Sequence, residues 1–285
     1  MASGHFPIPG TRAVRNASAS VGTVFMRLGH MATFLARAVA AIPLTLRHYR
    51  KEFFRLLSDV VWGNGSLVVG GGTAGVIIVL GAAAGAIVGI EGYNALHLLG
   101  LEPATGMISA TATTRELAPI MASLAFASQA GCRFTAQLGA MRISEEIDAM
   151  EALGIRSIPY LVTTRLMASV IAVIPLYIVC LAVNYLAVRM VIGVASGMSQ
   201  GTYDHYFTLV LSGTDVLYSL LKTVVFVVIT TTIQCYYGYY ASGGPQGVGV
   251  AAGRAMRASI STMIVVNLLL TVALWGIGTS ARLGG

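Results

Sequence analysis

The chain has 285 residues, of which 56% are hydrophobic and 10% are charged, and its mean hydropathy is +0.77. A soluble globular protein carries roughly 25% charged residues, because its surface has to be hydrated. The composition therefore excludes an ordinary soluble enzyme and a disordered chain. It predicts an integral membrane protein, and the apolar segments described below make it an all-α one.

The formal net charge is +7, and eight basic residues precede the first long apolar segment. Bases in this position are typical of a cytoplasmic segment that touches anionic lipid headgroups. They therefore indicate a cytoplasmic N-terminus and no nucleic-acid partner. Residues 1–23 contain Pro, Gly, Ser and Arg but no apolar core of a signal peptide, which predicts a flexible cytoplasmic arm.

Residues 24–57 place apolar side chains at helical spacing with Arg between them, and no window reaches the roughly 20 uncharged residues of a span. This pattern predicts an amphipathic helix that lies in the membrane interface. Five later segments reach spanning length, and they are 67–90, 103–130, 158–194, 215–237 and 259–277. The loops 91–102 and 195–214 carry acids without Lys or Arg, whereas 131–157 and 237–257 carry Arg. This alternation again predicts a cytoplasmic N-terminus.

Glycines repeat every four residues in the first span, at Gly81, Gly85 and Gly89. Small residues at this spacing form a flat stripe that allows another helix to approach closely. The stripe predicts either tight packing within one subunit or a packing face between subunits.

Motifs of catalysis are weak or absent. Gly-Lys occurs nowhere, so the chain has no phosphate-binding loop, and ATP, where it drives the protein, is bound by another chain. Residues 197–201 match GxSxG, but that motif requires a strand before the serine, and a membrane helix is expected there. The five histidines are scattered without metal-ligand spacing. We therefore predict no catalytic residue, no metal and no cofactor bound by this chain.

Three charges fall inside predicted spans, at Arg115, Glu116 and Lys222. A charged side chain at the centre of a bilayer costs roughly 2.5–3.5 kcal/mol on insertion scales, so it usually faces a partner or a water-filled cavity. We hypothesise that the three side chains line a polar part of a transport cavity, with Glu116 and Lys222 paired. The alternative is a purely structural ion pair between helices.

The segment 139–155, GAMRISEEIDAMEALGI, lies between the second and third spans and concentrates four acids, Glu145, Glu146, Asp148 and Glu151. Ser144 is a suitable helix cap and Gly154 a suitable helix stop, so we predict a short cytoplasmic helix over 144–153. An amphipathic helix in this position suits a motor domain that pushes on it. The alternative is a solvated acidic loop helix.

These residues carry a family resemblance. Thr114-Arg115-Glu116-Leu117-Ala118-Pro119, then Ala130-Gly131, the segment 139–155, Pro159 and Arg165 resemble the MlaE/YrbE permease family. The likeness covers about 45–280 and is closest to the YrbE subunits that accompany Mce proteins in mycobacteria. The chain departs from many relatives in carrying Ala118 for Gly, Gln137 for Glu and Thr164 for Pro.

The resemblance implies one permease domain over 24–285 in the inner (plasma) membrane, within an ABC transporter that moves lipids, with import as the expected direction. It implies a second permease subunit, identical or different, a cytoplasmic ATPase dimer that uses ATP, and a hexamer of MCE-domain proteins. In this reading 144–153 is the coupling helix, and Arg115, Glu116 and Lys222 belong to the lipid pathway. The residues that contact the ATPase are Arg142, Glu145, Glu146, Asp148 and Glu151.

Two other functions remain open on the sequence. An ion-coupled secondary transporter would use Glu116 as its carrier and would be expected to show inverted repeats, of which we find no convincing example. A passive membrane scaffold for the MCE assembly would need neither ATP nor an ion gradient.

Overall fold

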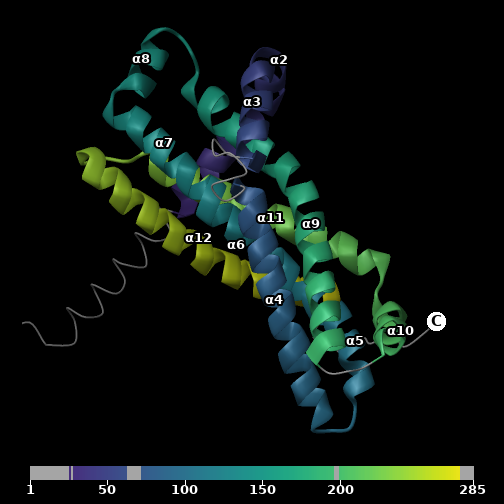
Figure 1. Cartoon of the computed structure of the whole chain (residues 1–285). Coiled ribbons are helices and arrows are strands. Elements are labelled where there is room, and N and C mark those ends of the chain that lie inside the picture. Colours follow the sequence, from purple (N-terminus) through teal and green to yellow (C-terminus); the bar gives the residue numbers. More distant parts are fainter. Residues whose placement is uncertain (1–25, 27, 63–71, 196–198, 277–285) are drawn as a thin grey trace, which may run out of the picture.

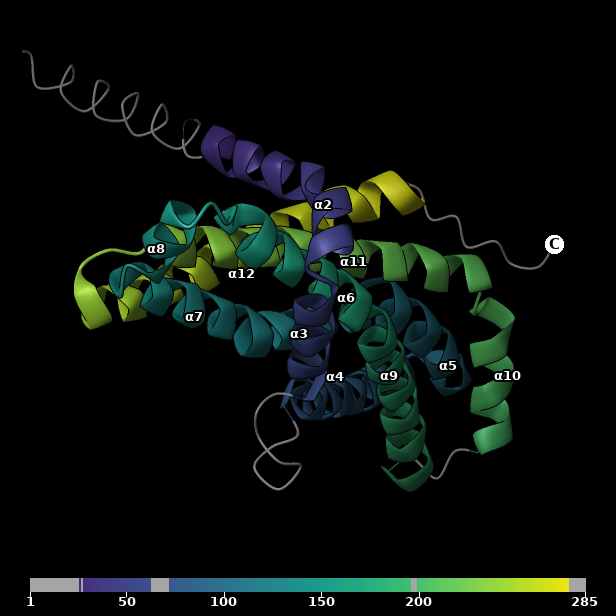
Figure 2. The same cartoon turned by 90° about the horizontal axis from the view of Figure 1, so that it is seen from above.

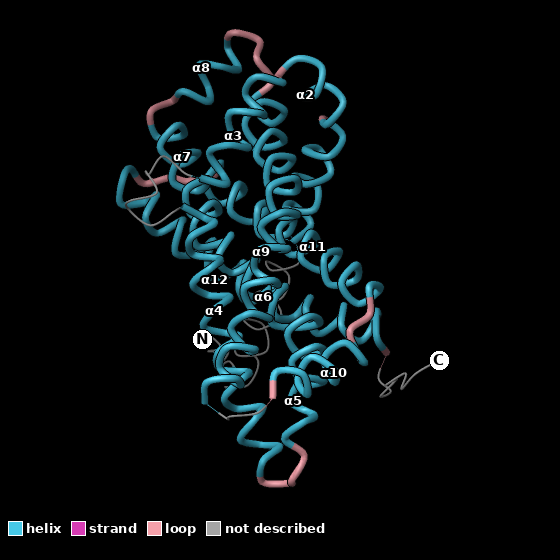
Figure 3. Tube along the Cα trace, turned by 45° about the vertical axis from the view of Figure 1, so that its right-hand side comes forward, coloured by secondary structure: helices cyan, strands magenta, loops and turns pink. Residues whose placement is uncertain are grey.

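The structure is a computed structural model that describes residues 26, 28–62, 72–195 and 199–276 (Figure 1). These residues form helices joined by short turns, and the trace in Figure 3 contains no strand among them. The predicted all-helical fold class is therefore confirmed. The predicted arm 1–23 and part of the GxSxG segment lie outside the described residues.

Four helical segments are long and apolar enough to cross a membrane. They are α4 (Gly72–His97), Ile158–Val194, which combines the π-helical η5 (Ile158–Thr163) with α9 (Thr164–Ala195), α11 (Gly213–Tyr239) and α12 (Gly244–Trp275). The shortest has 26 residues and is about 39 Å long at 1.5 Å per residue, which exceeds a hydrocarbon core of roughly 30 Å. The predictions for 158–194 and 215–237 are confirmed. Two bounds were wrong, because α4 continues to His97 and α12 begins at Gly244.

The predicted span 103–130 is not one regular α-helix. Residues 105–143 instead form consecutive helical turns that alternate between α and π geometry, and the segments are α5 (Thr105–Ile108), η3 (Ser109–Leu117), α6 (Ala118–Phe126), η4 (Ala127–Gly131) and α7 (Cys132–Ile143). Pro119 explains the first change of geometry, because it has no N–H to donate to the carbonyl four residues earlier. The run still passes from α10 (Gln200–Val210) to α8 (Glu146–Ala152).

The N-terminal region also differs from the prediction of a single interfacial helix over 24–57. It contains the helix Leu28–Ala40, then α2 (Ile42–His48) and α3 (Arg50–Trp62). A bend of 44° separates the first two, where Pro43 begins the new helix. Together these two helices are long and apolar enough for one broken crossing, so the candidate crossings number four or five among the described residues.

The helices place the connecting segments at two opposite ends of the molecule (Figures 1 and 3). α2, α3 and α8 lie at one end, which we call the α8 end, and α5 and α10 lie at the other, which we call the α10 end. α10 occupies a segment that the sequence predicts as a loop. Its Tyr203 is buried, which raises the pKa of the phenol, and its hydroxyl lies 2.9 Å from that of Ser109. The Arg-rich and acidic loops therefore alternate between ends as predicted.

The middle of the bundle is filled by α6 between α9 and α11. Ala118, Ala122 and Ala125 are completely buried, and such small side chains allow α6 to lie close to its neighbours. Phe126 and Tyr177 fill the space beside them and belong to the same core. α12 is different, because only 11% of its most apolar window is buried. Its outward face is apolar and is therefore suited to lipid or to a second subunit.

The glycine stripe of α4 packs against α9, beside which it lies in Figure 2. A methyl group added at Gly85 would lie 2.4 Å from the backbone oxygen of Asn184 and 2.9 Å from Cβ of Ala187. Gly81 and Gly89 make similar close approaches to α9. The stripe therefore serves packing within one subunit, the first of the two alternatives.

Gly85→Ala is expected to destabilise the protein, because the added methyl group meets backbone rather than a movable side chain. Overpacking of this kind costs about 1–3 kcal/mol. The measurement is thermal unfolding of the purified protein, followed by size-exclusion chromatography after heating. Gly253→Ala is the matched control, since an added methyl group there meets nothing within 4 Å. Equal melting temperatures for the two variants would contradict the proposed packing.

Candidate functional site

Lys222 is completely buried on α11, and all the contacts of its ammonium group are polar. Its Nζ lies 3.1 Å and 3.0 Å from the two carboxylate oxygens of Glu116 and 2.7 Å from the hydroxyl of Thr271. The backbone oxygen of Arg115, at 2.9 Å, accepts a further hydrogen bond. The predicted pairing of Glu116 with Lys222 is therefore present.

The local sequence explains why the Arg115 carbonyl is free to receive this bond. In a regular α-helix it would accept from the N–H of residue 119, but that residue is Pro119. The carbonyl lies in the π-helical η3, immediately before α6, and Lys222 supplies the missing donor. A buried backbone oxygen without a donor is costly, so Pro119 and Lys222 act together.

Glu116 has more partners than Lys222 alone. The amide nitrogen of Asn267 donates to its Oε2 at 2.8 Å, and the hydroxyl of Thr271 lies 2.7 Å from its Oε1. Both come from α12, so the carboxylate joins η3, α11 and α12. The Glu116 side chain is nevertheless 34% exposed, whereas that of Lys222 is 0% exposed. Of this pair, Glu116 is the member that another molecule can reach.

Arg115 points to a different partner. Its guanidinium lies 2.9 Å from Asp215 at the start of α11 and 5.4 Å from the ring centre of Trp275. The indole nitrogen of Trp275 donates to the other oxygen of Asp215 at 2.7 Å. We call Arg115, Glu116, Asp215, Lys222, Asn267, Thr271 and Trp275 the charge cluster. It brings together all three candidates from the predicted spans.

Four members of the charge cluster were missed from the sequence, namely Asp215, Asn267, Thr271 and Trp275. A signal was present, because Asn267, Thr271 and Trp275 follow each other at intervals of four residues and so share one face of a helix. Asp215 lies seven residues before Lys222, also on one face. These spacings place a polar stripe on each of the last two spans.

The predicted coupling helix is present as α8, with a different beginning. Ser144 is not its cap, because α7 continues to Ile143 and the Ser144 hydroxyl donates back to Ala140 at 3.0 Å. Glu145 precedes α8 with φ of 60°, a left-handed conformation that breaks the helix direction. Gly154, at φ of 78°, ends the segment as predicted.

The side chains of α8 divide into anchors and exposed acids. Ile147 is completely buried in the main core, and Glu151 accepts hydrogen bonds from Ser157 and from the Tyr239 hydroxyl, the latter at 3.2 Å. The acids Glu145, Glu146 and Asp148 remain exposed, and Arg142 pairs with Asp148 at 2.7 Å. α8 is therefore attached firmly to the bundle while it presents a negative face.

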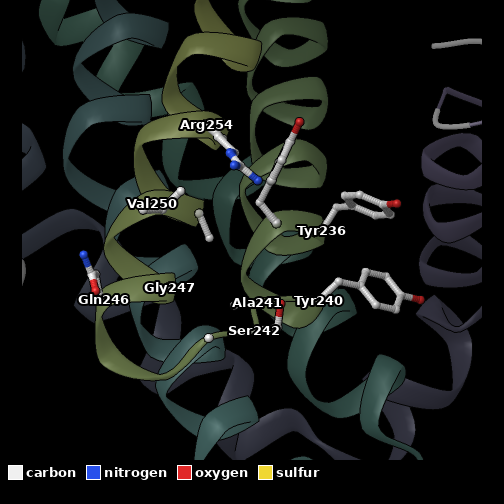
Figure 4. A pocket seen from close by; sticks show the side chains of 11 residues that line it. Tyr236, Tyr240, Ala241, Ser242, Gln246, Gly247, Val250 and Arg254 are labelled. Carbon is white, nitrogen blue, oxygen red and sulfur yellow. The ribbon is translucent and has the colours of Figure 1, made fainter. Parts of the chain in front are cut away.

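Two cavities lie at the α8 end, and no residue of the charge cluster lines either of them. The first, about 470 Å³, lies where α11 turns into α12, with Gln246 and Arg254 on its walls (Figure 4). Tyr236 and Tyr240 project from α11 on the same side in this view, toward the N-terminal helix. The second, about 660 Å³, lies between the N-terminal helix and the segment that follows α8.

Comparison with known proteins agrees with this arrangement. The family model described as Permease MlaE matches residues 63–273. A probable ABC transporter permease protein of Rickettsia bellii is 32% identical over 196 residues, which cover 66% of this chain and 72% of the relative. The intermembrane phospholipid transport system permease protein MlaE of Haemophilus influenzae is 26% identical over 256 residues, which cover 89% and 94%. A chloroplastic protein of Arabidopsis thaliana, TRIGALACTOSYLDIACYLGLYCEROL 1, is 31% identical over 173 residues, which cover 61% and 49%.

The matched region contains both the charge cluster and α8. It also contains all four of the long apolar helices over most of their lengths. The resemblance found in the sequence is thus confirmed at the level of the family, and the chain belongs to the MlaE family of membrane permeases.

Proposed function

We propose that this chain is the permease subunit of an ATP-driven lipid transporter, with the ATPase on a separate chain. The observation that carries the proposal is α8, a short helix with three exposed acids that is fixed to the bundle by Ile147 and Glu151. Such a helix suits a basic groove on a motor protein, because charge complementarity guides docking. Residues 142–151 are then the coupling segment, including Arg142, which orients Asp148.

The attachment of α8 supplies a mechanical route into the membrane. Glu151 binds Tyr239 near the end of α11, and the same helix carries Lys222. The two positions are about 26 Å apart along the helix axis. A helix moves largely as a rigid body, so a displacement of α8 is transmitted through α11 to the charge cluster. ATP hydrolysis in the partner thereby changes the site that meets the lipid.

The lipid pathway in this proposal passes the exposed side of Glu116. Asn267 Oδ1 is buried there without a hydrogen-bond partner among the described residues, so it offers an acceptor beside the carboxylate. Glu116 and Asn267 together suit the ammonium group of a phospholipid head. The phospholipid named for the Haemophilus influenzae relative is consistent with this chemistry.

The assembly follows the family resemblance. We propose one permease domain over 24–285, a second permease subunit against the open face of α12, a cytoplasmic ATPase dimer below α8, and an MCE-protein hexamer at the α10 end. The α8 end, with its Arg-rich segments, then faces the cytoplasm of the inner membrane. Import of lipid, and the closer relation to the YrbE subunits of Mce systems, belong to the same proposal.

The function is tested by reconstituting the purified complex into vesicles that contain fluorescent phospholipid. Lipid transfer is expected to require ATP and a co-purified ATPase subunit, and to be indifferent to a proton gradient. Transfer driven by the gradient without ATP would establish the ion-coupled alternative. Absence of transfer in an intact complex under both conditions would favour the scaffold.

A further inference from the structure

The 660 Å³ cavity at the α8 end is lined by two arginines and by apolar side chains. Arg37 comes from the helix Leu28–Ala40, and Arg156 comes from the turn between α8 and η5. The apolar part of its wall consists of Ala40, Ala41, Leu44, Ile155, Ile158 and Pro159. The cavity therefore combines a cationic rim with an apolar wall.

Neither arginine of the cavity has a carboxylate partner among the described residues. By contrast, Arg133, Arg142 and Arg189 each form an ion pair with an aspartate. Glu151 also reaches the cavity wall, but its carboxylate accepts hydrogen bonds from Ser157 and Tyr239. Two unpaired guanidinium groups beside one engaged carboxylate leave the cavity with an excess of positive charge, which favours an anion.

The cavity also opens toward lipid. Val39 and Leu46, on the two helices that form one of its walls, are 47% and 44% exposed. Exposed apolar side chains of this size next to a cationic rim are typical of a helix lying at the membrane interface. A molecule that enters from the bilayer brings both an anionic head and an apolar chain.

We propose that this cavity binds one anionic phospholipid of the surrounding leaflet, with its phosphate between Arg37 and Arg156 and an acyl chain along Leu44 and Ile158. This site is separate from the transport pathway, because Tyr239, which contacts the Glu151 side of the cavity, is about 26 Å from Lys222 along α11. The proposal rests on the membrane fold and not on the transport function.

Binding at this site has a consequence for α8. The lipid bridges the N-terminal helix and the segment 154–159, which follows α8 directly. It thereby steadies the end of α8 where Glu151 is anchored. An anionic leaflet is then part of the coupling apparatus and acts as a resident ligand rather than as cargo.

The test measures lipids retained by the intact complex in nanodiscs of dioleoylphosphatidylglycerol or dioleoylphosphatidylcholine, using native mass spectrometry after release into detergent. Wild-type protein is expected to retain the anionic lipid in preference to the zwitterionic one. Arg37→Ala combined with Arg156→Ala is expected to weaken retention of the anionic lipid by roughly tenfold or more, because two charge-assisted contacts are lost. Arg37→Lys with Arg156→Lys should preserve most of the preference.

Arg47→Ala combined with Arg257→Ala is the matched control, since it removes the same charge from two exposed residues that line neither cavity. Equal retention by the control and the cavity variant would overturn the proposal, as would equal retention of the two lipids by wild-type protein. The measurement needs neither ATP nor transfer, so its result is independent of whether the transport function is correct.

Discussion

Lys222→Met is expected to unfold or disassemble a large part of the purified protein. The substitution removes the ammonium group that neutralises Glu116 and that binds the Arg115 carbonyl. Breaking a buried ion pair costs 3–5 kcal/mol, and the lower end, about 3 kcal/mol, applies because Glu116 is partly exposed. The measurement is the yield of monodisperse complex together with its melting temperature.

The double variant Glu116→Gln with Lys222→Met separates the two roles of the pair. Replacing both charges removes the unpaired carboxylate, so stability is expected to return most of the way toward wild type. Lipid transfer by this folded variant is expected to be reduced at least tenfold, because the proposed pathway has lost its carboxylate. Normal transfer by the double variant would show that the pair is only structural.

Arg189→Met provides the matched control for the single substitution. Arg189 pairs with Asp204 at 2.7 Å, but both side chains are 43% exposed. Exposed pairs contribute roughly 0–1 kcal/mol, so this variant should keep the wild-type melting temperature within a few degrees. A loss equal to that of Lys222→Met would mean that burial is not what makes the Glu116 pair important.

Reversing the charge of the three exposed acids of α8, with Glu145→Lys, Glu146→Lys and Asp148→Lys, is expected to detach the ATPase from a folded permease. The buried anchor Ile147 and the Glu151 contacts stay in place, so only the Arg142 pair is lost inside the chain. The measurement is the amount of ATPase that co-purifies with the permease, which should fall at least tenfold.

Glu91→Lys with Glu102→Lys is the control for this experiment, because it reverses acids near the α10 end. It should leave the ATPase bound. A companion variant, Glu151→Gln, weakens the link from α8 to Tyr239 without changing the exposed acids. It is expected to retain the ATPase but to transfer lipid more slowly. Full retention of the ATPase by the triple reversal would exclude α8 as its docking helix.

The sequence predicted those parts of the fold that depend on large transfer energies. A long uncharged segment such as Ile158–Val194 has no favourable place outside a bilayer, and a charge such as Lys222 inside a span requires a partner. For this reason the long helices and the Glu116–Lys222 pair were both predicted. Asn267 and Thr271 cost much less in a membrane helix, so nothing in their chemistry marked them until α11 and α12 were seen together.

The errors lie where local signals compete with tertiary packing. Gly244 and Pro245 indicate a loop, yet α12 begins there, because Pro is tolerated in a first helical turn and the helix packs on α7. Ser144 has the chemistry of a helix cap, but its hydroxyl completes α7 instead. The π turns around Pro119 required knowledge of the Lys222 contact, which comes from more than a hundred residues away.

The pairing within the charge cluster has an electrical consequence. Arg115 is matched by Asp215 and Lys222 by Glu116, so the four ionised side chains carry no net charge. A potential of 100 mV does about 2.3 kcal/mol of work on one elementary charge that crosses a membrane. It does no net work on a balanced set that moves together. These residues therefore give the permease no voltage sensor, and its conformational cycle is insulated from fluctuations of the membrane potential at this site.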